Sequence, residues 1–226
     1  MDLSHIGMVL CDLDGTLVDS VPDLAFSVNR MLESLEMETH SEGSVRHWVG
    51  NGVERLVKRA LIGELDGEPD TVLYERALPI FLQLYAANTS ARSKLYPGVI
   101  EGLEGVLRLG IPLACVTNKA ERFTQPLLKD LGIDHYFGCV VSGDTLPTKK
   151  PDPAPLHYAA DFFKVPAHHA LMVGDSINDV RAARAANFQI VCVPYGYNHG
   201  QDIKIAEPDA IISGLQELPQ LLAKTA

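Results

Sequence analysis

Short apolar runs separated by helical patterns recur along most of the chain, and this alternation constrains the fold more than any other feature. The runs have the length of buried strands and span residues 7–11, 112–117, 139–142, 170–174, 189–194 and 210–212. Helical patterns occupy residues 99–109, 122–131, 155–163 and 179–186. Strands that alternate with helices need crossover connections, which cover both faces of a parallel sheet. The sequence therefore predicts an α/β fold with a Rossmann-like parallel sheet.

The stretch from residue 20 to residue 92 breaks this alternation. It contains no convincing buried strand, but apolar residues recur at helical spacing over 21–35, 52–63 and 71–87, and another helix begins at 44–47. The simplest interpretation is a helical insertion after the first strand. We therefore predict an α/β core domain made of residues 1–18 and 93–226, with an inserted helical domain at residues 19–92.

The charge balance limits the classes of partner. The chain of 226 residues carries 29 acidic and 19 basic side chains, which gives a formal net charge of −10. This argues against a nucleic acid or an anionic membrane as the main partner. A small phosphorylated metabolite is compatible with it, because a metal ion and a few lysines reverse the field inside one pocket. The sequence leaves open whether the protein is a monomer or a homodimer.

Targeting and redox features predict a cytoplasmic protein. The N-terminus lacks the basic region of a signal peptide, and no apolar run reaches the roughly 18 residues that span a bilayer. The four cysteines lie in or beside strand-like runs and form no CxxC pair, so we expect reduced, buried thiols. A structural zinc site or a catalytic thiol is the alternative.

Two carboxylates, Asp12 and Asp14, follow the first predicted strand directly. Ligands of open parallel sheets bind beyond the carboxyl ends of the strands, and residues two apart project to the same side. Two carboxylates without a partner are costly, and a divalent cation is the usual remedy. The competing interpretation is a simple turn, since an Asp-Gly pair such as Asp14-Gly15 is a common turn signal.

A second pair of acids, Asp175 and Asp179, follows the strand predicted at residues 170–174. Asp175 is placed for direct metal ligation. Asp179 falls in the first turn of the next helix, where it can hold a metal-bound water or orient the surroundings of Asp175. The alternative is purely structural. In that interpretation, Asp175 or Ser176 caps the helix and Asp179 favours its dipole.

Two further motifs at strand ends or in loops offer groups that bind phosphate. The Thr117 hydroxyl and the backbone N–H groups that follow it, including that of Asn118, can bind phosphate oxygens. Lys150 lies in a loop stiffened by prolines, which suits a fixed cation. Taken alone, each also fits an ordinary polar strand end or a solvated loop lysine.

In this order, the four motifs together resemble those of the haloacid dehalogenase superfamily of phosphotransferases, over essentially the whole chain. A closer likeness is to bacterial phosphoglycolate phosphatases. It rests on DLDGTLVDS at 12–20, GNGVER at 50–55, KPDPAP at 150–155 and YGYN at 195–198. Cys11 departs from the family, which more often carries an aromatic residue there. This departure alters packing behind the site and leaves every catalytic position intact.

The resemblance implies a phosphomonoester hydrolase that works through an aspartyl-phosphate. Asp12 matches the nucleophile, and Asp14 matches the general acid and base. Thr117 and Lys150 match residues that bind the phosphoryl oxygens, with the Asn118 N–H beside them.

The resemblance also implies a Mg²⁺ ion as cofactor. The Asp12 and Asp175 carboxylates and the backbone carbonyl of Asp14 match its ligands, and Asp179 lies behind them.

The insertion at residues 19–92 is similar to the family's small mobile cap, so we expect substrate choice to depend on it. Residues near 50–52, including Asn51, and the helix that carries Arg55 are the candidates. A short acid such as 2-phosphoglycolate needs a cation for its carboxylate, and Arg55 is the first candidate. The alternative is that Arg55 lies on an ordinary solvated helix face.

Other functions remain open at this stage. A phosphatase of another small sugar or organic-acid phosphate, or a hexose-phosphate mutase, uses the same core. A dehalogenase is disfavoured because Asp14 and the metal-binding acids are superfluous to it. A receiver-like phosphoacceptor module also combines clustered acids, a Thr and a Lys, but the helical insertion and the placement of Asp14 argue against it.

Overall fold

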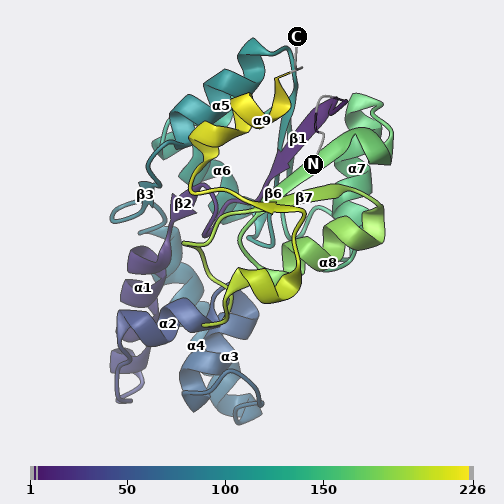
Figure 1. Ribbon diagram of the computed structural model, residues 1–226. Coiled ribbons are helices and arrows are strands. Elements are labelled where there is room, and N and C mark those ends of the chain that lie inside the picture. Colours follow the sequence, from purple (N-terminus) through teal and green to yellow (C-terminus); the bar gives the residue numbers. More distant parts are fainter. Residues whose placement is uncertain (1–2, 4, 224–226) are drawn as a thin grey trace.

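The computed structural model describes residue 3 and residues 5–223 of the chain. Within these residues a six-stranded sheet has the order β5-β4-β1-β6-β7-β8, and every neighbouring pair in it is parallel (Figure 1). Its strands are β1 Met8–Cys11, β4 Leu113–Val116, β5 Cys139–Val141, β6 Ala170–Gly174, β7 Gln189–Cys192 and β8 Ala210–Ile211. All six fall inside the runs that the sequence predicted, so the α/β prediction is confirmed.

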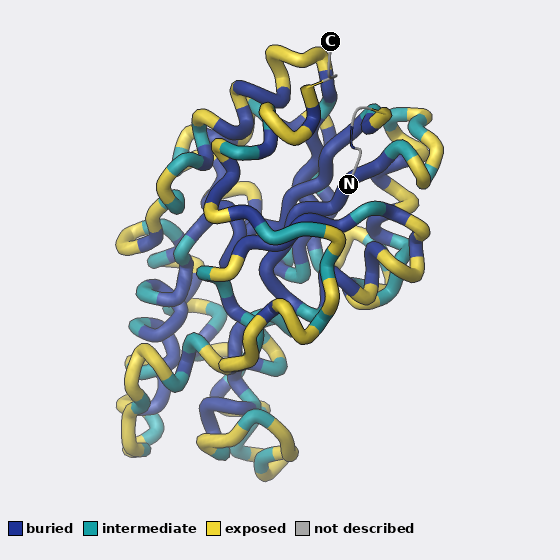
Figure 2. Tube along the Cα trace, viewed as in Figure 1, coloured by how far each residue is buried: buried dark blue, intermediate teal, exposed yellow. Residues whose placement is uncertain are grey.

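Helices cover both faces of the sheet because neighbouring residues of each strand point to opposite sides. Val9 and Cys11 of β1 belong to a hydrophobic cluster that includes residues of α5, α6 and α9, whereas Met8 and Leu10 pack with α7 and α8. The central strands β1, β4 and β6 are buried from end to end, whereas both residues of the edge strand β8 are half-buried (Figure 2). The helices are α5 Val99–Arg108, α6 Glu121–Asp130, α7 Ala154–Phe163, α8 Ile177–Ala186 and α9 Leu218–Leu222.

The helix α8 begins two residues before the predicted start at residue 179. Ser176 and Asp179 form a capping box in which each side chain bonds the backbone N–H of the other. The part of the structural alternative in which Ser176 caps the helix is therefore confirmed. Asp179 also takes part in the site, through its contact with Lys150.

Four helices, here called the helical segment, lie between two short strands outside the main sheet. They are α1 Val21–Ser34, α2 Glu42–Trp48, α3 Val53–Ile62 and α4 Thr71–Ala86. The strands β2 Val18–Asp19 and β3 Lys94–Leu95 pair in antiparallel fashion, so the chain leaves and re-enters the core at adjacent points. The segment has its own hydrophobic cluster, which also takes in Phe123 and Tyr197 from outside it. The domain division at residues 19 and 92 stays a prediction.

A buried carboxylate joins the start of the helical segment to its end. Asp23 in α1 accepts hydrogen bonds from the backbone N–H groups of Arg92 and Ser93 at 2.8 and 2.7 Å, and from the Ser93 hydroxyl at 2.7 Å. These bonds fix α1 against the segment's return to the core.

All four cysteines are buried and form no disulfide, as expected for core thiols. Among the described residues, no helix combines the length and the apolar character that crossing a membrane requires.

Candidate active site

The parallel register brings the strand-end motifs to one edge of the sheet. Cys11 at the end of β1 is paired with Cys115 of β4 and with Val173 of β6. Asp12 and Thr117, which follow the last residues of β1 and β4, therefore emerge side by side. Asp175 follows β6 at the same edge. The distances below result from this register.

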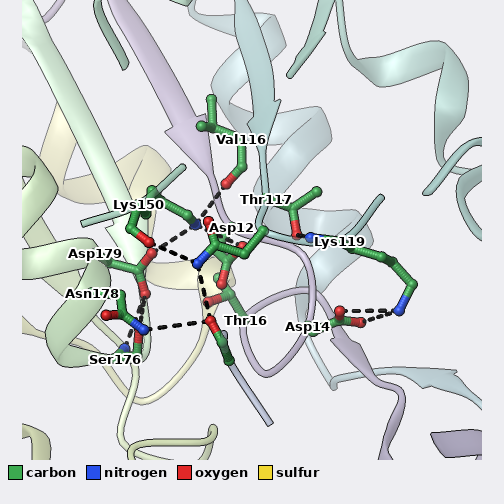
Figure 3. A network of polar contacts seen from close by, with 12 residues as sticks. Asp12, Asp14, Thr16, Val116, Thr117, Lys119, Lys150, Ser176, Asn178 and Asp179 are labelled. Atoms are coloured by element: carbon green, nitrogen blue, oxygen red, sulfur yellow. Dashed lines mark hydrogen bonds and ion pairs between the residues drawn. The ribbon is translucent and has the colours of Figure 1, made fainter. Parts of the chain in front are cut away.

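Lys150 is the centre of one polar network. Its ammonium lies 2.8 Å from Asp12 Oδ1 and donates hydrogen bonds of 2.7 Å to Asp179 Oδ1 and to the Val116 carbonyl (Figure 3). The side chain is buried, and burial alone would lower the pKa of Lys150. Attraction to the Asp12 and Asp179 carboxylates outweighs it and holds that pKa above its ordinary value. Lys150 is thus a fixed cation beside Asp12, rather than a solvated loop lysine.

Three buried carboxylates gather at the same place. Asp12, Asp175 and Asp179 each offer one oxygen atom, and these atoms lie within 4.8 Å of one another. Burial raises the pKa of Asp12 to about 7; Lys150 opposes the rise and Asp179 adds to it. Burial, then repulsion from Asp12 and Asp179, holds the pKa of Asp175 well above its ordinary value. One lysine therefore does not balance the negative charge of the group.

The group fits a divalent cation that prefers oxygen ligands. Carboxylate oxygens are the donors that Mg²⁺ takes in proteins, and added positive charge would favour the ionised forms of Asp12 and Asp175. Asp175 is already oriented, because its two oxygens accept hydrogen bonds of 2.6 Å from the Thr16 hydroxyl and the Tyr197 backbone N–H. Asp179 is one of the three clustered carboxylates. Its predicted role behind the metal ligands stays a prediction.

The side chain of Asp14 lies apart from this group. Lys119 donates to both Asp14 carboxylate oxygens at 3.0 Å, and its ammonium also donates to the Tyr85 hydroxyl at 2.5 Å. The predicted metal contact of Asp14 uses its backbone carbonyl and stays a prediction. Sequence analysis missed Lys119, although it belongs to the Thr-Asn-Lys motif that follows β4.

A cavity connects these groups to the helical segment. From the core its lining includes Asp12, Asp14, Thr117, Asn118, Lys119 and Lys150, and from the helical segment it includes Leu24, Val49, Gly50, Gly52, Val53 and Leu56. The Asn118 amide donates to the Gly50 carbonyl at 3.0 Å and to the Lys150 carbonyl at 2.9 Å. Asn178 also donates to the Gly50 carbonyl, at 3.4 Å. The loop at residues 50–52 thus borders the site, as expected.

The structure does not bring Asn51 or Arg55 to the lining of this cavity. The Arg55 guanidinium donates to the Gly67 and Leu65 carbonyls at 2.9 and 3.2 Å and pairs with Glu68 at 2.9 Å. Asn51 Oδ1 accepts a hydrogen bond from Arg59 at 2.9 Å. Three of the five residues predicted to bind substrate, Thr117, Asn118 and Lys150, do line the cavity.

Two contacts that orient Asp175 were not predicted from the sequence. Thr16 and the Tyr197 N–H hold Asp175 from positions 159 and 22 residues away along the chain. Both lie inside motifs that the sequence singled out, DLDGT and YGYN. Composition and spacing gave no signal for their contact with Asp175.

We expect Gly15→Ala to lose activity and metal affinity. Gly15 has φ of 93°, and a Cβ there would lie 2.3 Å from Asp175 Oδ2 and 2.9 Å from the Tyr197 ring. Asp175 must then shift, and the strained backbone costs about 1–3 kcal/mol of folding free energy. Gly110→Ala is the matched control, since its φ is 76° and nothing lies within 4 Å of the added Cβ. Thermal denaturation should show strain in both variants, whereas Mg²⁺ titration should show a loss in Gly15→Ala alone. Equal Mg²⁺ affinities would contradict the expected displacement of Asp175.

Comparisons with known proteins agree with this geometry. A family model described as haloacid dehalogenase-like hydrolase matches residues 9–193. A protein named phosphoglycolate phosphatase from Nitrosococcus oceani is 59% identical over 219 residues, with 97% of each chain covered. One of the same name from Nitrosospira multiformis is 48% identical over 221 residues, with 98% of this chain and 97% of the relative covered.

A solved structure agrees as well. The crystal structure of a predicted phosphoglycolate phosphatase from Haemophilus somnus 129PT superimposes with a TM-score of 0.91 at 36% sequence identity. The superposition covers 97% of this chain and 99% of that one.

Proposed function

The chain belongs to the haloacid dehalogenase-like hydrolase family and is a phosphatase, and from this premise we propose that it hydrolyses 2-phosphoglycolate with Mg²⁺ through an aspartyl-phosphate on Asp12. The observation that carries the mechanism is the position of Asp12, which lies in the cavity beside the buried Lys150 ammonium, with Asp14 in the same lining. The names of near relatives support the choice of substrate.

In the proposed first step, a carboxylate oxygen of Asp12 forms a bond to phosphorus while the bond from phosphorus to the leaving oxygen breaks. Asp14 gives its proton to that leaving oxygen, so glycolate departs as an alcohol. Lys150 holds a phosphoryl oxygen, and Thr117 and the Asn118 N–H bind the others.

In the second step, Asp14 takes a proton from water, and the water oxygen attacks phosphorus. The bond between phosphorus and Asp12 breaks, which releases inorganic phosphate and restores both carboxyl groups. Asp12, Asp175 and the Asp14 carbonyl would hold the Mg²⁺ ion, with Asp179 behind them. When bound, the ion offsets the repulsion between an anionic nucleophile and an anionic phosphate. The helical segment closes the cavity and excludes bulk water from the reacting atoms.

The proposed substrate leads to a specificity test. We expect kcat/KM for 2-phosphoglycolate to exceed that for 2-hydroxyethyl phosphate, which replaces the carboxylate by a neutral group of similar size. A charge-assisted contact contributes about 1.5–3 kcal/mol, which corresponds to roughly a tenfold to hundredfold preference. Equal values for the two esters would rule out 2-phosphoglycolate as the recognised substrate and leave the phosphatase activity standing.

The same pair of substrates tests the predicted role of Arg55. If Arg55 binds the carboxylate during turnover, Arg55→Ala lowers the preference and spares an aryl phosphate. If Arg55 only ties α3 to the Leu65 and Gly67 carbonyls, the preference is unchanged and thermal stability falls.

A further inference from the structure

Lys119 is a buried cation for which the mechanism above has no role. Its side chain is 2% exposed, and it lies in the short loop between β4 and α6. Figure 3 shows the pair that it forms with Asp14 apart from the network of Asp12, Lys150 and Asp179. The cavity lining thus includes two lysines, each of which serves a different carboxylate of the proposed reaction.

We propose that Lys119 is a positioning residue that holds the Asp14 carboxylate at the leaving-group end of the cavity, and that Tyr85 of the helical segment holds Lys119. This inference rests on the proposed function, because it assigns Asp14 the proton transfer to the leaving oxygen. Lys119 acts through Asp14 and does not itself touch the transferring phosphoryl group.

The contacts of Asp14 explain why its position depends on Lys119. Its side chain is only 14% exposed, and both of its oxygens lie 3.0 Å from the Lys119 ammonium. Within the described residues, these are the side-chain hydrogen bonds and the ion pair that Asp14 makes. The ionised carboxylate, held by both oxygens, loses its freedom to rotate, and the protonated acid can still accept from Lys119 through its carbonyl oxygen. A proton donor misplaced by even 1 Å can lose a hundredfold in rate.

The position of Lys119 depends in turn on the helical segment. The Tyr85 hydroxyl accepts from the Lys119 ammonium, and the Tyr85 ring lies 4.9 Å from the same nitrogen. Tyr85 is fully buried in α4, and its ring packs against Phe123 of α6 at a centroid distance of 4.8 Å. The chain Tyr85–Lys119–Asp14 therefore joins the helical segment to the proposed acid. In this proposal, the packing of the helical segment on the core adds to the contacts that hold Asp14 in place.

The variant Lys119→Met keeps most of the length of the side chain and removes its charge. Its rates with three substrates distinguish the positioning role from the alternatives. Loss of positioning should lower kcat by about 10- to 100-fold for 2-phosphoglycolate and 2-hydroxyethyl phosphate, whose alkoxides need a proton. It should change the pre-steady-state burst of nitrophenolate from 4-nitrophenyl phosphate by less than about threefold, because nitrophenolate leaves without a proton and this burst precedes the attack of water. Lys129→Met, an exposed lysine of α6, is the matched control and should leave all three rates unchanged.

A double-mutant cycle tests whether Lys119 acts through Asp14. In an Asp14→Asn background, Lys119→Met should lower kcat for 2-phosphoglycolate by less than about twofold, because the group that it positions is already disabled. Tyr85→Phe removes only the hydroxyl. It should show a smaller effect with the same dependence on the leaving group, which provides a test even if Lys119→Met folds poorly.

The other outcomes overturn the proposal. A loss confined to 2-phosphoglycolate, mostly in KM, would make Lys119 a reader of the substrate carboxylate. Equal losses for all three esters in the first half-reaction, or full additivity with Asp14→Asn, would make its role structural. Failure of the proposed function is distinguishable, since the wild-type protein would then turn over none of the esters or show no preference for 2-phosphoglycolate.

Discussion

Asp12→Asn is expected to abolish hydrolysis of 2-phosphoglycolate while the protein stays folded. The amide is nearly isosteric with the carboxylate but is not a nucleophile, so kcat should fall by more than about a thousandfold. The cavity and the Lys150 contact with Asp179 do not depend on the lost charge. Steady-state kinetics on a physiological ester and circular dichroism of the same sample check both halves of this expectation.

The effect of Asp12→Asn on folding stability follows from the pKa of Asp12. Burial raises the pKa of Asp12 from 3.8 to about 7 in the folded state, so the wild-type chain loses folding stability as the pH rises between these values. The Asn variant lacks this titration. In metal-free buffer at pH 8, it should therefore melt at the same temperature as the wild type or higher. A clearly lower melting temperature at pH 8, or near-normal turnover, would show that Asp12 has a different role.

Removal of the metal is expected to have an effect of similar size. Asp12, Asp175 and Asp179 gather more negative charge than Lys150 balances, so the reaction should stop after chelation and return with Mg²⁺. Ca²⁺ should bind and support little turnover, because its looser coordination misaligns an in-line attack. Elemental analysis of the chelated protein should accompany the assay, to verify that the metal has been removed. Full activity in verified metal-free buffer would exclude a metal-dependent reaction.

Metal affinity should also depend on pH. Asp12 binds a cation as the carboxylate, and its pKa of about 7 means that the protonated form dominates below neutral pH. Apparent Mg²⁺ affinity should therefore rise between pH 6 and pH 8. Calorimetry at these two pH values measures the change, and Asp12→Asn should bind Mg²⁺ weakly at both.

The centre of the sheet could be predicted because β1, β4 and β6 are buried on both faces. Such strands appear as uninterrupted apolar runs, and their parallel connections force the strand-end residues to one edge. This is why Asp12, Thr117 and Asp175 could be placed together from the sequence. The strands β2 and β3 could not be found, since each has two residues and is defined only by its pairing with the other.

Side-chain pairing across long stretches of sequence was the part that could not be predicted. Lys119 and Asp14 are 105 residues apart, and Lys119 and Tyr85 are 34 residues apart in different elements. No local sequence pattern predicts a contact between side chains so far apart in the chain. Arg55 shows the converse, because a basic residue near the predicted loop was a reasonable candidate for the cavity. In the fold, the Arg55 guanidinium instead donates hydrogen bonds to the Leu65 and Gly67 carbonyls.

The most direct test of the proposed mechanism is to trap the covalent intermediate. Wild-type protein with Mg²⁺ is mixed with 2-phosphoglycolate labelled in its phosphoryl group and quenched in acid within milliseconds. Peptide mass spectrometry then locates the label. The mechanism predicts labelled phosphate on Asp12 that forms and decays at rates consistent with turnover, and its absence in Asp12→Asn. Normal turnover with no label on Asp12 at any quench time would contradict an aspartyl-phosphate at this residue.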